Sequence, residues 1–246
     1  MNPVWSLMPV ASPAPSRLPG GSPRDLLALE ESIPFCARCP ELRTYGAEIA
    51  ATKRRAYLDW DYWGRPVPGF GDRRARILIV GLAPAAHGAN RTGRMFTGDR
   101  SGDFLYAALH RAGLANQPAA EHRNDGLELR DVYITAALRC APPGNRPTAA
   151  QLRQCSGFLI REIEILQPRV ILCLGSIAWN AVLRIQPPGH IPRRPKPKFA
   201  HGAECLIGDR HLLACFHVSQ QNTFTGRLTE PMLDAILARA VVLARG

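Results

Sequence analysis

Four cysteines are spaced in a pattern that could bind a metal centre. Cys36 and Cys39 form a C-x-x-C pair, Cys140 ends a predicted strand, and Cys155 lies in the first turns of the next predicted helix. A loop and a helix can bring distant thiols together, so the four thiolates could hold tetrahedral zinc or a [4Fe–4S] cluster. A C-x-x-C pair also suits a redox site beside a βαβ unit, but this one does not follow a strand. The spacing also differs from the two close pairs of a compact zinc ribbon.

Two loops carry further polar chemistry. Residues 81–99 read GLAPAAHGANRTGRMFTGD, which is too long and too rich in Gly and basic residues for a minimal strand-to-helix connection. Long loops in compact domains are often functional. The glycine spacing fits neither a dinucleotide-binding fingerprint nor a Walker loop, so nucleotide-cofactor binding is not supported. The second loop, 217–223, follows the last predicted strand, and its position opposite the first loop favours a functional His217 over a structural one.

Short apolar, β-branched runs alternate with helix-like segments over most of the chain. We predict strands at 76–81, 132–138, 170–175 and 211–216, and helices at 101–112, 148–166, 176–183 and 230–244, with Thr148 as a helix cap. This alternation predicts an α/β fold with three α/β/α layers and a central, mostly parallel four-stranded sheet. The ligand crevice of such a fold lies at the carboxyl ends of the strands. The loops after Val80, Leu138 and Phe216 should therefore converge on one site.

The composition is that of a globular protein with a basic surface. Hydrophobic residues make up 46% of the 246 residues, and no apolar run approaches the roughly 20 residues that span a bilayer. The N-terminus lacks the basic start and apolar core of a signal peptide, so we expect a cytoplasmic protein without membrane contact. The net charge of +11 fits a polyanionic partner such as nucleic acid as well as it fits a merely solubilising surface.

Two segments depart from the alternating pattern. Residues 1–24 are rich in Pro, Ser, Ala and Gly, so we expect a flexible tail ahead of a single domain at 25–246, which begins helically at Asp25. The segment 187–198, PPGHIPRRPKPK, is either a solvated loop or an arm that contacts phosphates. Seven cysteines, an odd number, argue against a disulfide framework. Three of them lie in apolar stretches and are expected to be small core residues: Cys173, Cys205 and Cys215.

Taken together, these loops and cysteines resemble the uracil-DNA glycosylase superfamily, and most closely its family 5, the type-5 iron–sulfur enzymes. The matching segments are 81–99, RCAPPGNRPT at 139–148 and HVSQQNTFTGRLT at 217–229, and the likeness extends from about Arg24 to the C-terminus. It implies hydrolysis of the N-glycosidic bond of uracil that is flipped out of double-stranded DNA, which leaves an abasic site. It also implies a [4Fe–4S] cluster with four ligands: Cys36, Cys39, Cys140 and Cys155.

The resemblance further implies roles for single residues. The loop containing Gly81, Ala83 and Pro84 would form the pocket edge beside the sugar, and Phe96 would stack on the flipped base. His217 would donate a hydrogen bond to a uracil carbonyl as negative charge develops on the departing base.

Ala83 stands where most of the superfamily has Asp or Asn to orient the attacking water, and Ala cannot do so. The water should then be held by Asn145 or, as second choice, by Asn90. Such a pocket should discriminate less sharply, so we expect hypoxanthine or other deaminated bases among the substrates.

Three arginines are candidate contacts to DNA phosphates, or plain surface charge: Arg91, Arg94 and Arg227. Val218 departs from the Pro that usually follows the His in related enzymes, which would loosen that loop. The cluster should brace the fold, because glycosidic hydrolysis moves no electrons, and we expect a monomer. Two alternatives stay open: an iron–sulfur nucleic-acid-binding protein without glycosylase activity, which Ala83 permits, and a zinc-bearing hydrolase of small nucleosides.

Overall fold

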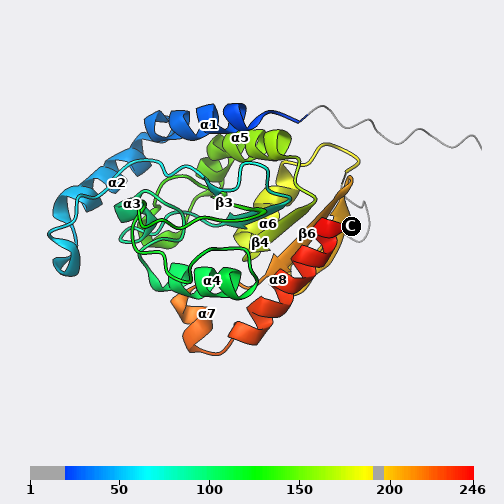
Figure 1. Cartoon of the computed structure of the whole chain (residues 1–246). Coiled ribbons are helices and arrows are strands. Elements are labelled where there is room, and N and C mark those ends of the chain that lie inside the picture. The colour runs from blue at the N-terminus through cyan, green and yellow to red at the C-terminus, as the bar shows by residue number, and fades with distance from the viewer. Residues whose placement is uncertain (1–19, 191–196) are drawn as a thin grey trace, which may run out of the picture.

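The computed structural model describes residues 20–190 and 197–246, so most of the predicted tail, and residues 191–196 of the predicted loop or arm, lie outside the described residues. The described chain forms one sheet with helices on both faces (Figure 1). The strands are β1 (Phe70–Gly71), β2 (Ile77–Gly81), β3 (Val132–Ala136), β4 (Val170–Leu174), β5 (Glu204–Ile207) and β6 (Arg210–Cys215). The helices are α1 (Pro23–Ser32), α2 (Pro40–Thr52), α3 (Ala89–Thr92), α4 (Arg100–Arg111), α5 (Ala149–Leu166), α6 (Ser176–Arg184), α7 (Gln220–Phe224) and α8 (Glu230–Arg245), with short 3-10 turns η1 (Ile33–Phe35), η2 (Arg55–Tyr57) and η3 (Pro143–Asn145). None of the helices in this described part could cross a membrane, given their lengths and hydropathy.

The sheet has the order β1-β3-β2-β4-β6-β5. Its four inner strands are parallel, which confirms the predicted parallel core, and their bounds fall within two residues of the prediction. The sheet has six strands rather than the predicted four, because β1 and β5 add antiparallel edges. Neither edge has a long buried run: β1 has two residues, and in β5 only Ile207 is buried. The apolar pattern used for the inner strands is therefore absent from both.

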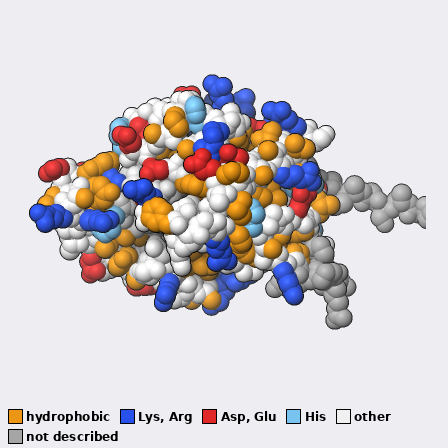
Figure 2. Space-filling view, turned by 90° about the horizontal axis from the view of Figure 1, so that it is seen from below, with side chains coloured by type: hydrophobic (Ala, Val, Ile, Leu, Met, Phe, Trp, Pro, Cys, Tyr) orange, Lys and Arg blue, Asp and Glu red, His pale blue; other side chains and the backbone are white. Residues whose placement is uncertain are grey.

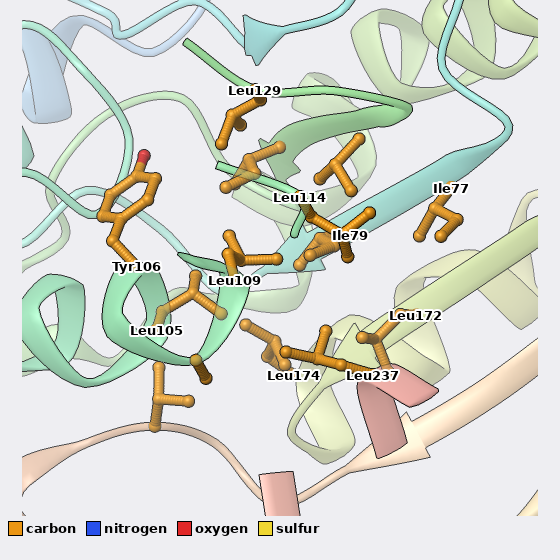
Figure 3. Packing of buried hydrophobic residues seen from close by; sticks show 14 of the residues in the cluster. Ile77, Ile79, Leu105, Tyr106, Leu109, Leu114, Leu129, Leu172, Leu174 and Leu237 are labelled. Carbon is orange, nitrogen blue, oxygen red and sulfur yellow. The ribbon is translucent and has the colours of Figure 1, made fainter. Parts of the chain in front are cut away.

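One face of the sheet is covered by α4 and α8. Side chains of a strand alternate between faces, so Ile77 and Ile79 point to this side. They pack with Leu105 and Leu109 of α4 and with Leu237 of α8 in one buried cluster (Figure 3). This layer fixes the start of α4, and with it the end of the long loop 81–99.

The opposite face is covered by α1, α5 and α6 (Figure 1). Leu78 and Val80 of β2 pack there against Leu159 of α5 and Trp179 of α6. The three layers of the predicted α/β/α fold are thus confirmed. Two of the three cysteines predicted as core residues are fully buried in strands, and the third is half-buried in β5: Cys173, Cys215 and Cys205.

Helices α1 and α5 both begin at capping boxes. Thr148 caps α5 as predicted, because its hydroxyl accepts from the Gln151 amide while the Gln151 side chain accepts from the Thr148 amide. Ser22 and Asp25 form the same pair at α1, with Pro23 at the first helical position. The first helix therefore starts at Pro23, inside the segment predicted as tail.

Candidate active site

Three loops meet at the carboxyl edge of the parallel strands. The chain leaves β2 at Gly81 toward β3 on one side, whereas β4 lies on the other side of β2. This reversal makes the crevice between β2 and β4 the expected ligand position. Gly175 follows β4 and donates its amide hydrogen to the Cys215 carbonyl (2.8 Å). A methyl group at Gly175 would lie 3.2 Å from Cβ of His217, so the loops after β4 and β6 are in contact.

The Phe96 ring fills the space between the ends of β2 and β6. A methyl group at Gly81 would lie 2.7 Å from the Phe96 ring, so only Gly permits this approach. The Phe96 and His217 ring centroids are 6.3 Å apart, with the ring planes inclined by 37°. Phe96 has a φ of 52°, in the left-handed region where a residue with a large side chain is strained. The structure therefore brings together three of the predicted site residues.

Burial sets the charge state of His217. It lowers the pKa of this imidazole to about 4, so the ring is neutral at pH 7. A neutral imidazole carries one N–H donor and one acceptor nitrogen. The His217 carbonyl accepts a hydrogen bond from Nδ2 of Asn222 (2.8 Å), which fixes the main chain below the ring.

The loop with Ala83 and Pro84 is held to the loop after β3. Leu138 donates its amide hydrogen to the Leu82 carbonyl (3.0 Å), which continues the strand pairing past the ends of both strands. Pro84 is buried. The Ala83 methyl packs in an apolar cluster that includes the cysteines of the N-terminal segment and of the β3–α5 loop.

Asn145 lies on that same β3–α5 loop, at the end of η3. It is exposed and has a φ of 56°, following Gly144 at 58°. Its amide side chain makes no hydrogen bond within residues 20–190 and 197–246. The predicted water-holding amide is thus exposed to solvent, in the loop beside that of Ala83.

Asn90, the second candidate for holding water, is only 1% exposed. Its Nδ2 donates to the carbonyls of Gly46 in α2 (3.3 Å) and Ala86 (3.4 Å). The side chain therefore ties α2 to the loop 81–99, which gives Asn90 a role in positioning that loop.

Arg91 does not have the exposed guanidinium that the predicted phosphate contact requires. It is 3% exposed, and its Cζ lies 3.9 Å from the ring centroids of both Tyr57 and Trp60. Two of its nitrogens donate to the carbonyls of His87 (2.8 Å) and Gly98 (2.6 Å). Cation–π contacts and these hydrogen bonds make Arg91 a clamp between η2 and the loop 81–99.

Arg94 is likewise turned inward, which corrects its predicted phosphate contact. It is 4% exposed and binds Asp125 through two hydrogen bonds of 2.7 and 2.6 Å. Burial of Asp125 acts to raise its pKa, but the hydrogen bonds from Arg94 and from main-chain amides outweigh burial and lower the pKa to about 2. The guanidinium is occupied by this internal ion pair.

Arg227 keeps an exposed position after α7, with its Cζ 4.7 Å from the Phe216 ring. It follows Phe224, which is 70% exposed. Figure 2 shows the face with α4, α7 and α8, where Lys and Arg side chains are scattered, with Asp and Glu among them. Of the three arginines predicted to contact phosphates, Arg227 alone remains available at the surface.

All four cysteines of the predicted cluster line one small cavity. They come from the turn between η1 and α2, from the loop after β3 and from α5: Cys36, Cys39, Cys140 and Cys155. Burial raises the pKa of Cys140 to about 12 and that of Cys155 to about 11. Thiolates at these positions therefore require a positively charged partner.

Two polar groups of the long loop were not singled out from the sequence. The His87 ring bonds the Tyr62 hydroxyl through Nδ1 (3.1 Å), and Tyr62 lies in a preceding segment with no local signal for this contact. Asp99 caps α4 by accepting from the Gly102 amide (3.0 Å), and burial raises its pKa. An Asp directly before a helical run is a recognisable cap signal.

Comparison with known proteins shows the family of the chain. The family model of the uracil DNA glycosylase superfamily matches residues 68–240. The chain is 52% identical over 227 residues to the type-5 uracil-DNA glycosylase of Mycobacterium tuberculosis, with 91% of this chain and 84% of that protein covered. It is 56% identical to the protein of that name from Mycobacterium leprae over 88% and 94% of the two chains. The corresponding Thermus thermophilus protein is 49% identical over 89% and 99%.

The parallel-stranded α/β fold and the match to the family model over residues 68–240 together define the class of the protein. The chain belongs to the uracil DNA glycosylase superfamily. Within that superfamily it is similar to the type-5 proteins over most of its length, whereas a type-4 uracil-DNA glycosylase of Pyrobaculum aerophilum is 32% identical over 65% of the chain.

Replacing His217 by Gln should remove a defined part of the pH dependence of stability. In the wild type the unfolded state takes up a proton at the ordinary pKa of 6.5, whereas the buried ring stays neutral down to about pH 4. The contribution to the free energy of unfolding is therefore complete above pH 6.5, and about 3 kcal/mol is lost as the pH falls to about 4. Urea unfolding at pH 7, 5 and 4 measures it. The exposed His122→Gln variant is the control, and equal pH slopes for wild type and His217→Gln would contradict the assignment.

Proposed function

We propose that this protein is a uracil-DNA glycosylase that hydrolyses the N-glycosidic bond of uracil flipped out of double-stranded DNA and leaves an abasic site. Membership of the superfamily and about half identity to proteins named type-5 uracil-DNA glycosylase support the proposal. The observation that carries it is the pairing of the Phe96 ring with a half-buried, neutral His217 against Gly81. An aromatic face and a single N–H donor are suited to a planar base with a carbonyl group.

His217 supplies the electrophilic part of the mechanism. As the glycosidic bond breaks, negative charge gathers on the carbonyl oxygens of the departing uracil. A hydrogen bond from the imidazole N–H becomes stronger with that charge, so it lowers the barrier rather than only binding substrate. Low solvent exposure strengthens this bond further. Phe96 holds the flipped base by stacking, which offsets part of the few kcal/mol spent on unstacking it from the duplex.

In this proposal Asn145 holds the attacking water. Its amide is unbonded within the described residues and lies in the loop next to that of Ala83, whose methyl group has no atom that could hold water. An amide orients water through hydrogen bonds but takes up no proton at neutral pH. Most of the rate enhancement must then come from stabilising the leaving base and from DNA phosphates that face a cationic sugar. Arg227 contacts those phosphates.

We also propose that the four cysteines bind a [4Fe–4S] cluster. The donor set fits, since four thiols from three segments surround one buried cavity. In the described part of the chain no three His, Cys, Asp or Glu side chains are grouped closely enough for a single metal ion. A [4Fe–4S] cluster is held by four cysteine thiolates, each on a separate iron atom, which is the donor set present here. When bound, the cluster would cross-link η1 and α2 to α5, and glycosidic hydrolysis takes no electron from it.

The remaining expectations follow from the same proposal. We propose a cytoplasmic monomer with one catalytic domain at 25–246. We also propose that the pocket accepts hypoxanthine and other deaminated bases, because Ala83 rejects no substrate through an unpaired polar group.

A duplex with one uracil, followed by alkaline cleavage at abasic sites, tests the activity and the role of Asn145. Wild type should cleave, and Asn145→Gly should lower the single-turnover rate by about 100-fold, as expected when the attacking water is misplaced. Glycine accepts the positive φ of this position, so the variant removes the amide without straining the loop. The exposed loop variant Asn124→Gly is the matched control. An inactive wild type that binds DNA would favour the alternative, an iron–sulfur nucleic-acid-binding protein.

The same assay on a duplex containing inosine tests the breadth of substrates. Hypoxanthine should be released by the wild type at a rate within about 100-fold of uracil, since a pocket without a discriminating polar group separates substrates by only a few kcal/mol. Rapid uracil release with no detectable hypoxanthine release would contradict this expectation without affecting the glycosylase proposal.

Cys140→Ser should lose the cluster. Wild type should contain about four iron atoms per chain and absorb broadly at about 400 nm. The variant should lose most of that iron, unfold at lower temperature, and lose uracil excision because Asn145 lies on the same loop. Cys205→Ser is the matched control, because Cys205 lies in β5, outside the cavity. Equal iron content in Cys140→Ser and Cys205→Ser would show that Cys140 is not a ligand.

A further inference from the structure

The wall of the cysteine cavity contains a buried arginine whose hydrogen bonds are incomplete. Arg139 precedes Cys140, lines the cavity and is 1% exposed. Its Nη2 donates to Oε2 of Glu162 in α5, which is fully buried. Its Nε and Nη1 have no hydrogen-bond partner among the described residues, and both atoms are inaccessible to solvent. Leaving a buried charged donor unpaired is costly, so such atoms call for an explanation.

The main chain of Arg139 is also engaged at the cavity. Its carbonyl accepts a hydrogen bond from the Val67 amide (2.8 Å). Glu162 Oε2 accepts a second hydrogen bond from the Thr135 hydroxyl of β3 (2.8 Å). The arginine is thus fixed at both ends. Glu162 Oε2 binds one nitrogen of the guanidinium, whereas Nε and Nη1 have no acceptor among the described residues, and Oε1 of Glu162 has no donor there.

We infer that Arg139 is a positioning residue for the cluster, whose free Nε and Nη1 groups donate to its sulfur atoms while Glu162 orients the guanidinium. This inference rests on the proposed cluster. Four thiolates give an iron–sulfur centre a net negative charge, and hydrogen bonds to its sulfurs set its stability and reduction potential. Glu162 keeps the fork in place, which a flexible, solvated side chain could not do.

The other two arginines of the cavity do not fit this role. Arg38 is exposed, and its Cζ lies 4.9 Å from the Phe158 ring. Arg43 donates to the Pro34 carbonyl (3.3 Å) and is half-buried. Water screens such groups, so their effect on a buried anionic centre is smaller.

The test compares iron–sulfur properties rather than activity. The main variant is the double substitution Arg139→Met with Glu162→Leu, because replacing both members of a buried ion pair by apolar residues avoids an unpaired charge. In the presence of a chelator, its 400-nm absorbance should decay about tenfold faster than that of the wild type. Removing a group that supports metal ligands typically costs about 10- to 100-fold in metal affinity, and tenfold is the lower end of that range. Its reduction potential, measured by titration with dithionite, should be more negative, since the reduced cluster loses its donors.

Arg139→Lys should fall between wild type and the double variant in both measurements, because it keeps the charge and loses the fork. It also decides the case if the double variant fails to fold. Arg38→Met is the matched control and should retain the wild-type potential. Folded Arg139 variants with wild-type chelation rates and potentials would overturn the inference and leave the cluster intact. Wild-type protein without iron would overturn the cluster as well.

Discussion

The site depends on the parallel pairing of β2 with its two neighbours. That pairing places Gly81 in the middle of the carboxyl edge, and the Leu138-to-Leu82 hydrogen bond carries the pairing into the loops beyond. Because Gly81 has no side chain, the Phe96 ring can lie against the strand end and meet His217 from β6. A shift of one residue in this register would turn every side chain of the strand to the opposite face and disrupt the packing at this edge.

Although the protein is basic, several of its arginines are buried and bind partners inside the fold. Arg91 is enclosed by two aromatic rings, Arg94 is paired with Asp125, and Arg139 is paired with Glu162. Each joins segments that are distant in sequence, since a guanidinium fork can bond in several directions at once. The long loop 81–99 lacks regular structure over much of its length, and the inward-pointing Arg91 and Arg94 hold it to neighbouring segments.

The sequence predicted the parallel core well because buried strands leave unbroken apolar runs, as at 77–81 and 170–174. The edges β1 and β5 leave no such trace, because their pairing depends on neighbours brought in by the fold. In the candidate site, the residue types and the family resemblance selected Phe96, His217 and the cysteines, but they could not show which way a side chain points. The sequence alone does not distinguish Arg91 from Arg227, because tertiary packing decides that the first is buried and the second is exposed.

Ala83 connects the pocket to the cysteine cavity. Its methyl group packs in the same apolar cluster as Cys36 and Cys140. A carboxylate at this position would lie in that apolar cluster beside the cysteines, and burying an unpaired charge is strongly unfavourable. The small apolar residue therefore suits the wall that it shares with the cavity. In the proposed function the attacking water is oriented from the next loop, where the Asn145 side chain is exposed and makes no hydrogen bond within the described residues. The residue at position 83 must therefore suit both the candidate site and the packing around the cysteines.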